Sequence, residues 1–314
     1  MSPRPRVNRS VVSSLAAATA LSVLVAGCSS GSDEASPSTS ATAAACATES
    51  ASRAAGAAPV PIAPATVTVL DAGAGDRRAP AAAPDVATPQ MVTLVTTSEV
   101  ASPGSADAQT VDMPLTARFG CADPTNLEMD LGTVTSPDTT LDDQLSAMSG
   151  SKAGLTLAPG LAPVSLRIAP AADAGGEARL AVEQALVSAM NTAVAVPTEP
   201  IAVGASWRSE RVIASAATVT QTIEARLTAW EGSRLTIEFT SDESPVNSVF
   251  AIPGGGDSLT ISRYTYSGRG TMTVDLTRGL PVAGEATYRG ARELVGADPA
   301  RPLIQQTGLS VTWR

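Results

Sequence analysis

Alternation of apolar and polar residues with a period of two is the strongest pattern in the last third of the chain. Between residues 218 and 228, one set of alternate positions is polar throughout, and the other is apolar except at Gln221. Such alternation places the two sets on opposite faces of a β-strand. After a turn at Glu231–Gly232, residues 234–240 repeat the pattern. We therefore predict an antiparallel pair of strands, each with one apolar face.

Other segments show the same alternation. Residues 271–276 and 309–313 predict two more strands of this kind, and a slip in phase near Arg263 predicts a β-bulge. Weaker candidates earlier in the chain are residues 66–70, 91–100, 111–119, 127–131, 155–157 and 164–168. Proline cannot donate to the ladder of hydrogen bonds between strands, so Pro114 predicts that its strand lies at an edge of the sheet.

Only two segments have helical periodicity. Residues 177–192 place Val182, Leu186 and Met190 on one stripe, with Asp173 as the expected N-cap. A shorter helical turn is expected over residues 141–148. Few helices and many one-sided strands predict a mainly β, α+β fold, in which an antiparallel, strongly curved sheet forms a half-barrel or an open barrel.

A curved sheet that is incompletely covered leaves room for an apolar ligand on its concave face. All three tryptophans and all three tyrosines lie between Trp207 and Trp313, so we expect the later half of the chain to supply most of the core. The side chains predicted to face a ligand, partly covered by the helix, are Val219, Ile223, Leu227, Leu235, Ile237, Phe239, Met272, Val274, Leu276 and Val311. The alternative is that these side chains pack only against one another, as an ordinary core.

The first 28 residues have the features of an export signal. Residues 1–10 contain three arginines and no acidic residue, and residues 11–25 are almost wholly apolar or small but too short for a membrane-spanning helix. The following "LVAGC", which ends at Cys28, resembles the lipobox of bacterial lipoproteins. This resemblance implies that residues 1–27 are removed and that Cys28 carries the lipid. We therefore expect a lipid-anchored protein on the outer face of the cell membrane.

Composition divides the remainder into a tether and a domain. Residues 28–59 are mostly Ser, Thr, Ala, Gly and Pro, and cannot bury enough apolar surface to offset the entropy lost on ordering. We expect a disordered tether there, followed by a single β-rich domain over residues 60–314. The expected parts of this domain are a weaker first half at 60–170, the helix at 176–193 and a stronger meander at 204–314.

Two cysteines remain when Cys28 is lipidated. They are Cys46 and Cys121. Thiols outside the cytoplasm favour a disulfide bond, with two free thiols as the alternative.

Charge and residue inventory exclude several classes of function. The formal charge is -9, which loss of three arginines with the signal makes -12, so we expect no nucleic-acid binding. The chain has no histidine, which rules out a Ser-His-Asp site, and its acidic residues lack the spacing of a calcium loop. "GDSL" at Gly256–Leu259 therefore has no partner histidine, and Ser149 with Lys152 lacks the K-T-G strand of penicillin-recognising enzymes. We expect no enzyme, and no bound metal or cofactor.

Two wider resemblances concern the later half. The segments "PIAVGASWRSE" and "GRGTMTVDLTRGLPVAGEATYRG" resemble a group of uncharacterised bacterial lipoprotein domains. The pattern of long strands with one polar face, together with one helix, is similar to that of the half-barrel envelope lipid carriers of mycobacteria and of the lipoprotein-localisation system. This likeness implies a protein that binds a lipid or another apolar ligand on its curved sheet. The alternative is a structural or adaptor domain that binds an envelope protein partner and has no ligand cavity.

Overall fold

The computed structural model describes residues 45–51, 57–252 and 257–314. Cys28, the expected site of lipidation, lies outside these residues, as do the expected export signal and much of the expected tether. The strands are β1 (Ala58–Pro61), β2 (Thr66–Asp71), β3 (Gln90–Ser102), β4 (Ser105–Phe119), β5 (Asn126–Leu131), β6 (Lys152–Ala158), β7 (Ala162–Ala169), β8 (Ser206–Ile213), β9 (Val219–Glu231), β10 (Arg234–Pro245), β11 (Val249–Ala251), β12 (Ser258–Asp275), β13 (Ala283–Val295) and β14 (Leu303–Trp313). The helices are α1 (Thr139–Leu145), the 3-10 helices η2 (Ser146–Met148) and η3 (Pro159–Leu161), and α2 (Gly176–Asn191).

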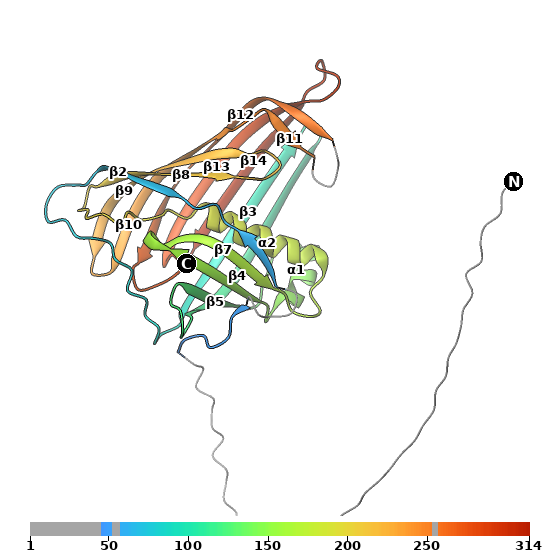
Figure 1. The fold of residues 1–314 in the computed structure, drawn as a ribbon. Helices are drawn as coiled ribbons and strands as arrows, with labels where there is room; N and C mark the ends of the chain where they lie inside the picture. Colours follow the sequence, from blue (N-terminus) through green and yellow to red (C-terminus); the bar gives the residue numbers. More distant parts are fainter. Residues whose placement is uncertain (1–44, 52–56, 253–256) are drawn as a thin grey trace, which may run out of the picture. The chain divides into compact units, whose positions relative to one another are not determined.

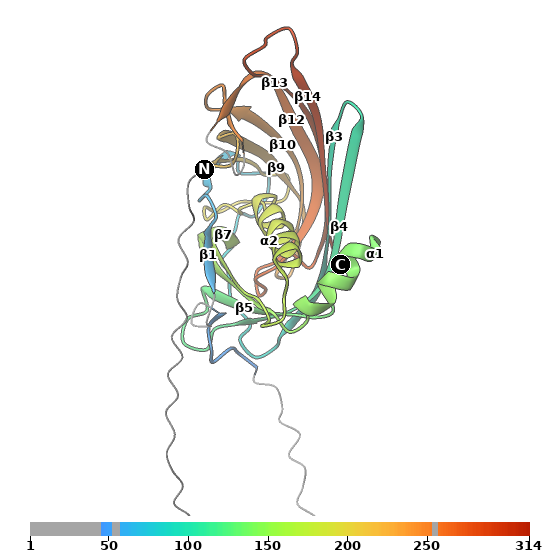
Figure 2. The same ribbon diagram turned by 90° about the vertical axis from the view of Figure 1, so that its right-hand side faces the viewer.

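All of these strands belong to one antiparallel sheet. Its order is β1-β7-β6-β5-β4-β3-β14-β13-β12-β10-β9-β8-β2, and the short β11 pairs with β12. The sheet curves strongly without closing into a barrel (Figure 1). Helix α2 lies inside the curve, between β1 and β7 on one side and the long strands β12 to β14 on the other (Figure 2). This arrangement confirms the predicted α+β fold with an open, curved, antiparallel sheet.

The two ends of the sheet are joined by a short stretch of chain. Strand β1 pairs with β7 at one end, and β2 pairs with β8 at the other. Between them, Ile62 is buried and its N–H donates to the carbonyl oxygen of Val164. Residues 58–71 therefore cross the open side of the curve and tie its two ends together (Figure 1).

Strand register confirms most of the local predictions. Strands β9 and β10 meet at the predicted turn, and the β12 and β13 register shifts between Ile261 and Arg263, at the predicted bulge. The edge prediction for Pro114 is wrong, because β4 pairs with both β3 and β5. The physical reason is that β5 pairs with β4 only as far as Leu115, so the missing N–H of Pro114 lies just beyond the end of this ladder.

Helix α2 matches the predicted helix to within one residue at either end. Its buried face includes four alanines, which allow the helix to approach the sheet closely. The predicted cap is wrong: Gly175 is the N-cap and makes no side-chain capping bond. At the other end, the guanidinium of Arg211 donates to the carbonyl oxygens of Met190 and Ala193, at 3.4 Å and 2.6 Å. These bonds satisfy carbonyl groups that the end of a helix leaves without partners.

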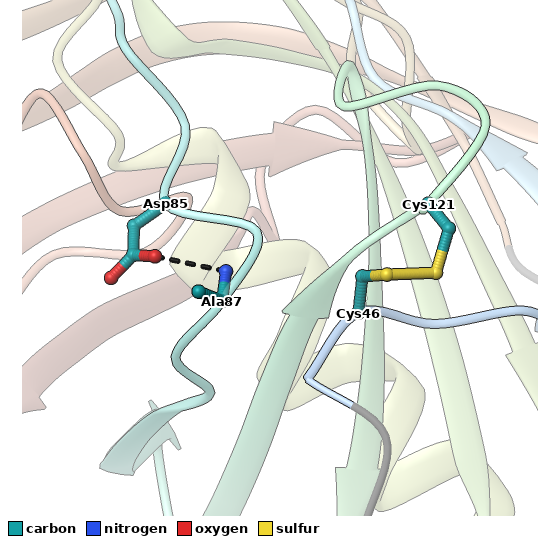
Figure 3. The surroundings of a disulfide bond; sticks show 4 residues. All are labelled: Cys46, Asp85, Ala87 and Cys121. Carbon is teal, nitrogen blue, oxygen red and sulfur yellow. Dashed lines mark hydrogen bonds between the residues drawn. A yellow bond between two sulfur atoms is a disulfide. The ribbon is translucent and has the colours of Figure 1, made fainter.

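Cys46 and Cys121 form a disulfide bond in the structure (Figure 3). Beside the bond, Ala47 forms a β-bridge with Gly120, and the N–H of Ala51 donates to the carboxylate of Glu128 at 2.7 Å. Residues 45–51 are thus held against the β4–β5 end of the sheet, although composition assigned them to a disordered tether. The disulfide and long-range hydrogen bonds supply the order that their side chains do not.

The main hydrophobic core lies between α2 and the concave face. Its largest fully buried side chains are Trp207, Tyr288, Leu94, Met113, Leu127, Met129, Leu145, Met148, Leu155, Leu166, Leu186 and Ile201. Most of these largest side chains precede α2, whereas most of the buried apolar residues as a whole lie in the later half of the chain. Tryptophan and tyrosine occur only in the later half, but β3 to β7 contribute a mainly aliphatic set of side chains to the same core.

Candidate ligand cavity

The ten side chains predicted to face a ligand are all buried. Nine of them belong to the main core, and only Val219 lines the principal cavity of the concave face. Helix α2 and the crossing segment 58–71 supply more cover than the sequence pattern indicated. The cavity lies farther along the same strands.

A row of polar side chains crosses the concave face at that point. Arg211 on β8 is the register partner of Gln221 on β9, which is the partner of Glu243 on β10. Farther across the sheet, Tyr264 on β12 is the partner of Arg292 on β13. Register partners point to the same face of a sheet, so these residues form one inward-facing row. We call them, together with Gln305 on β14, the polar row.

Hydrogen bonds link neighbouring members of the polar row. The hydroxyl of Tyr264 donates to Glu243 Oε2 at 2.8 Å, and Gln221 Nε2 donates to Glu243 Oε1 at 3.4 Å. Arg292 Nε donates to Gln305 Oε1 at 2.9 Å. Gln221 is only 3% exposed, yet its Oε1 finds no hydrogen-bond partner within the described part of the chain. A buried acceptor without a partner costs free energy, so a group that occupies the cavity and donates to it is favoured.

The cavity beside the polar row has a volume of about 360 Å³. Its walls come from the last two turns of α2 and from β9, β10, β12, β13 and β14. The apolar part of the lining includes Ile213, Val219 and Leu309. The volume is within the range of small-molecule sites, and the mixed lining suits an amphipathic molecule.

Two stacked tyrosines form part of the cavity wall. The rings of Tyr266 and Tyr288 lie 5.8 Å apart between centroids, at an interplanar angle of 16°. Gly268 permits this arrangement, because a Cβ atom at that position would overlap the ring of Tyr288. All three tyrosines of the chain line the cavity and present flat apolar surfaces there.

The cavity separates two hydrophobic clusters. On one side is the main core, and on the other is a small cluster formed by Ala217, Val219, Phe250, Ile261 and Leu294. The polar row interrupts what would otherwise be one continuous apolar surface. Packing on both sides can therefore hold the cavity open while the row supplies its polar groups.

Burial perturbs the ionisable groups of the row. It raises the pKa of Glu243, because a partly dehydrated carboxylate is disfavoured, although hydrogen bonds from Tyr264 and Gln221 oppose the shift. Burial also raises the pKa of Tyr264, Tyr266 and Tyr288, so these hydroxyls stay protonated. For Arg211 and Arg292, burial lowers the pKa of the guanidinium. The polar row can thus bind a ligand through hydrogen bonds and charge, in a site from which much of the water is excluded.

Two other hollows differ in character. A depression of about 730 Å³ lies on the outer face of the sheet and is lined by exposed glutamates and arginines. A hollow of about 300 Å³ lies between the β3–β4 hairpin and the helices, and shares Gln184 with the cavity. The charged residues in its lining are Asp107, Asp138 and Glu177.

The sequence pattern contained one signal for this site. Gln221 was the single interruption of an otherwise apolar strand face, and a buried polar residue is more informative than an exposed one. Glu243 was missed because the predicted strand ended at residue 240, and Arg292 and Tyr288 were missed because β13 was not predicted. The phase slip near Arg263 left the direction of Tyr264 and Tyr266 open. Among the residues weighed for catalysis, Ser149 caps η2, Lys152 begins β6 and Ser258 begins β12, all outside the cavity lining.

A comparison with protein-family models finds no match to this chain, and a comparison with curated proteins finds none either. Across residues 45–51, 57–252 and 257–314, no helix combines the length and apolar character needed to cross a bilayer.

Proposed function

We propose that the protein is a lipid-anchored, extracytoplasmic binding protein whose cavity holds one amphipathic molecule. The observation that carries this proposal is the cavity of about 360 Å³, whose lining includes the buried Gln221, a residue with an amide oxygen that has no donor among the described residues. Apolar walls beside the polar row suit a molecule with both an apolar and a polar part. The sheet and α2 act as a rigid frame for this molecule, with no residues assigned to catalysis.

The anchoring part of the proposal rests on the sequence. "LVAGC" at residues 24–28 resembles a lipobox, and the bond between Cys46 and Cys121 suits an oxidising compartment outside the cytoplasm. Replacement of the anchor, Cys28→Ala, should release the protein from the membrane or leave it unprocessed. Membrane fractionation with mass analysis of the N-terminus measures this, and a correctly cleaved variant that still needs detergent for release would contradict the anchor.

The binding part is tested by filling the cavity. Ser188 lies on α2 and lines the cavity, so Ser188→Trp should block it. Leu180 on the same helix is 68% exposed, and Leu180→Trp is the matched control. We expect the full-length wild-type protein and the control to bind the neutral fluorescent probe N-phenyl-1-naphthylamine at one site, and Ser188→Trp to lose this binding with an unchanged melting temperature.

Native mass spectrometry supplies a second readout. Wild-type protein purified from cells should carry an adduct of defined mass that solvent extraction identifies, and Ser188→Trp should lack it. Absence of probe binding together with absence of an adduct contradicts the proposed function, as does probe binding that survives Ser188→Trp.

An adaptor function is the second candidate, and exposed apolar side chains favour it. They lie near the end of the sheet where β10 and β12 to β14 turn, and are Val246, Val249, Ile252, Leu303 and Ile304, each at least 37% exposed. Surface apolar groups of this kind occur at protein contact sites. Crosslinking from Val249 in intact cells tests this candidate: a specific protein crosslink that persists in Ser188→Trp would support a contact independent of the cavity.

A further inference from the structure

The lining of the cavity contains two charged side chains, Glu243 and Arg292, and neither forms an ion pair with another described residue. Arg292 lines the cavity from β13, with its guanidinium carbon 4.3 Å from the centre of the Phe250 ring. Its Nε bonds to a neutral glutamine, and no carboxylate among the described residues lies within ion-pair distance. On the opposite face of the same strand, Arg289 pairs with Glu99 at 3.6 Å. Arg292 is therefore a partly buried cation without a counter-ion.

Glu243 does not fill that role. Its carboxylate accepts hydrogen bonds from Tyr264 and Gln221, and Tyr264 lies between it and Arg292 in the polar row. Burial raises the pKa of Glu243. Arginine stays protonated even where burial lowers its pKa, because the ordinary pKa of a guanidinium is far above neutral pH. The cavity thus offers a cation at one end and a hydrogen-bonded carboxyl group at the other.

The charges along the concave face differ between the cavity and the hollow beside it. The neighbouring hollow, which shares Gln184 with the cavity, carries only acidic charged groups in its lining. An anion is repelled from that hollow and attracted to Arg292. Tyr266 adds a hydroxyl donor to the same cavity and makes no hydrogen bond to another described residue. The cavity therefore offers one further donor in addition to Arg292.

We infer that the cavity takes an amphiphile whose polar end is an anionic oxygen group, a carboxylate or a phosphate, bound by the terminal guanidinium nitrogens of Arg292. This inference rests on the proposed function and adds the chemical class of the ligand. Arginine binds both groups through paired N–H donors, and the bonds strengthen where water is excluded. The apolar chain of the ligand lies along Ile213, Val219 and Leu309.

A series of twelve-carbon competitors tests the charge. The wild-type full-length protein is loaded with N-phenyl-1-naphthylamine and titrated with dodecanoate, dodecyl phosphate, dodecanol and dodecyltrimethylammonium below their micelle concentrations. We expect one or both anions to displace the probe at concentrations about tenfold to a hundredfold lower than dodecanol, the factor for a hydrogen bond to a charged group. The better of the two anions identifies carboxylate or phosphate as the head group, and the cation should compete least.

Variants on the two faces of β13 locate the effect. Arg292→Gln should retain probe binding but lose the preference for anions over dodecanol, and Arg292→Lys should restore part of it. Arg289→Gln, on the outer face, is the matched control and should keep the full preference. Equal displacement by dodecanoate, dodecyl phosphate and dodecanol overturns the inference, as does an Arg289→Gln loss equal to that of Arg292→Gln.

The wild-type titration stands even if Arg292→Gln fails to fold. Probe binding with no preference for anions contradicts only the inference about charge. Failure of the probe to bind at all contradicts the proposed function itself.

Discussion

The concave face has two regions that share the same strands and differ in what their inward side chains can do. In the first, Leu227, Ile237 and Met272 belong to the same buried core as the apolar side chains of α2, and the hollow that remains among the core side chains measures about 30 Å³. In the second, the polar row borders about 360 Å³ of open volume. One curved sheet therefore encloses a sealed core where its inward-facing side chains are apolar, and a cavity where they are polar.

The position of α2 separates the two regions. Its alanines let it lie close against aliphatic side chains, and it ends at Asn191. The last two turns of α2 meet both regions: Ala189 and Met190 face the sealed core, whereas Gln184, Ser188 and Asn191 line the cavity. Two sides of one helix thus border the core and the cavity.

The largest effect should come from a charge placed in the sealed region. Ile237 is fully buried, so Ile237→Asp buries a carboxylate without a partner and should cost more than about 4 kcal/mol of the free energy of unfolding. Most domains have only about 5 to 15 kcal/mol in total, so we expect a largely unfolded chain by circular dichroism.

Gln221→Leu, in the polar row of the neighbouring strand, is the matched comparison. It removes a buried oxygen that has no partner and should leave the free energy of unfolding within about 1 kcal/mol of the wild-type value. If Gln221→Leu were as destabilising as Ile237→Asp, the row would be a structural part of the core and not a ligand site.

An intermediate effect is expected from the disulfide. The bond closes a loop with a sequence separation of 75, and its removal by Cys46→Ser with Cys121→Ser should lower the free energy of unfolding by about 4 kcal/mol on the loop-entropy model. None of the residues that line the cavity comes from β4 or the segment before β1. Chemical denaturation should therefore show the loss, while the affinity for N-phenyl-1-naphthylamine stays unchanged under conditions where the variant is folded. A parallel loss of affinity would show that the two regions are coupled.

The smallest effect should be the pH dependence of Glu243. Its pKa is raised in the folded state, so the folded protein binds this proton more tightly than the unfolded chain. Its contribution to stability is complete below the ordinary pKa of 4.5 and is lost as pH rises through the raised value. Glu243→Gln has no such loss. The melting temperature of the variant minus that of the wild type should therefore increase as pH rises from 4 to 8. A difference that is constant over this range would contradict the raised pKa.

Local sequence signals located much of the secondary structure, but they did not predict β8 or β13. Period-two alternation located β9, β10 and β14, the phase slip located the bulge beside Arg263, and helical periodicity located α2. These features depend on residues close together in the chain. The edge prediction from Pro114 failed, because the neighbour of a strand and the point where that neighbour ends are properties of distant residues.

For this protein, the sequence by itself determined that one face of each long strand is apolar and that the sheet must curve around something. Only the tertiary structure decided what the sheet curves around: α2 and the crossing segment cover most of the face, and a cavity lined by Gln221, Glu243 and Arg292 occupies the rest. The physical reason is that alternation specifies the direction of a side chain, whereas its cover depends on strand register and on elements that arrive from elsewhere in the chain.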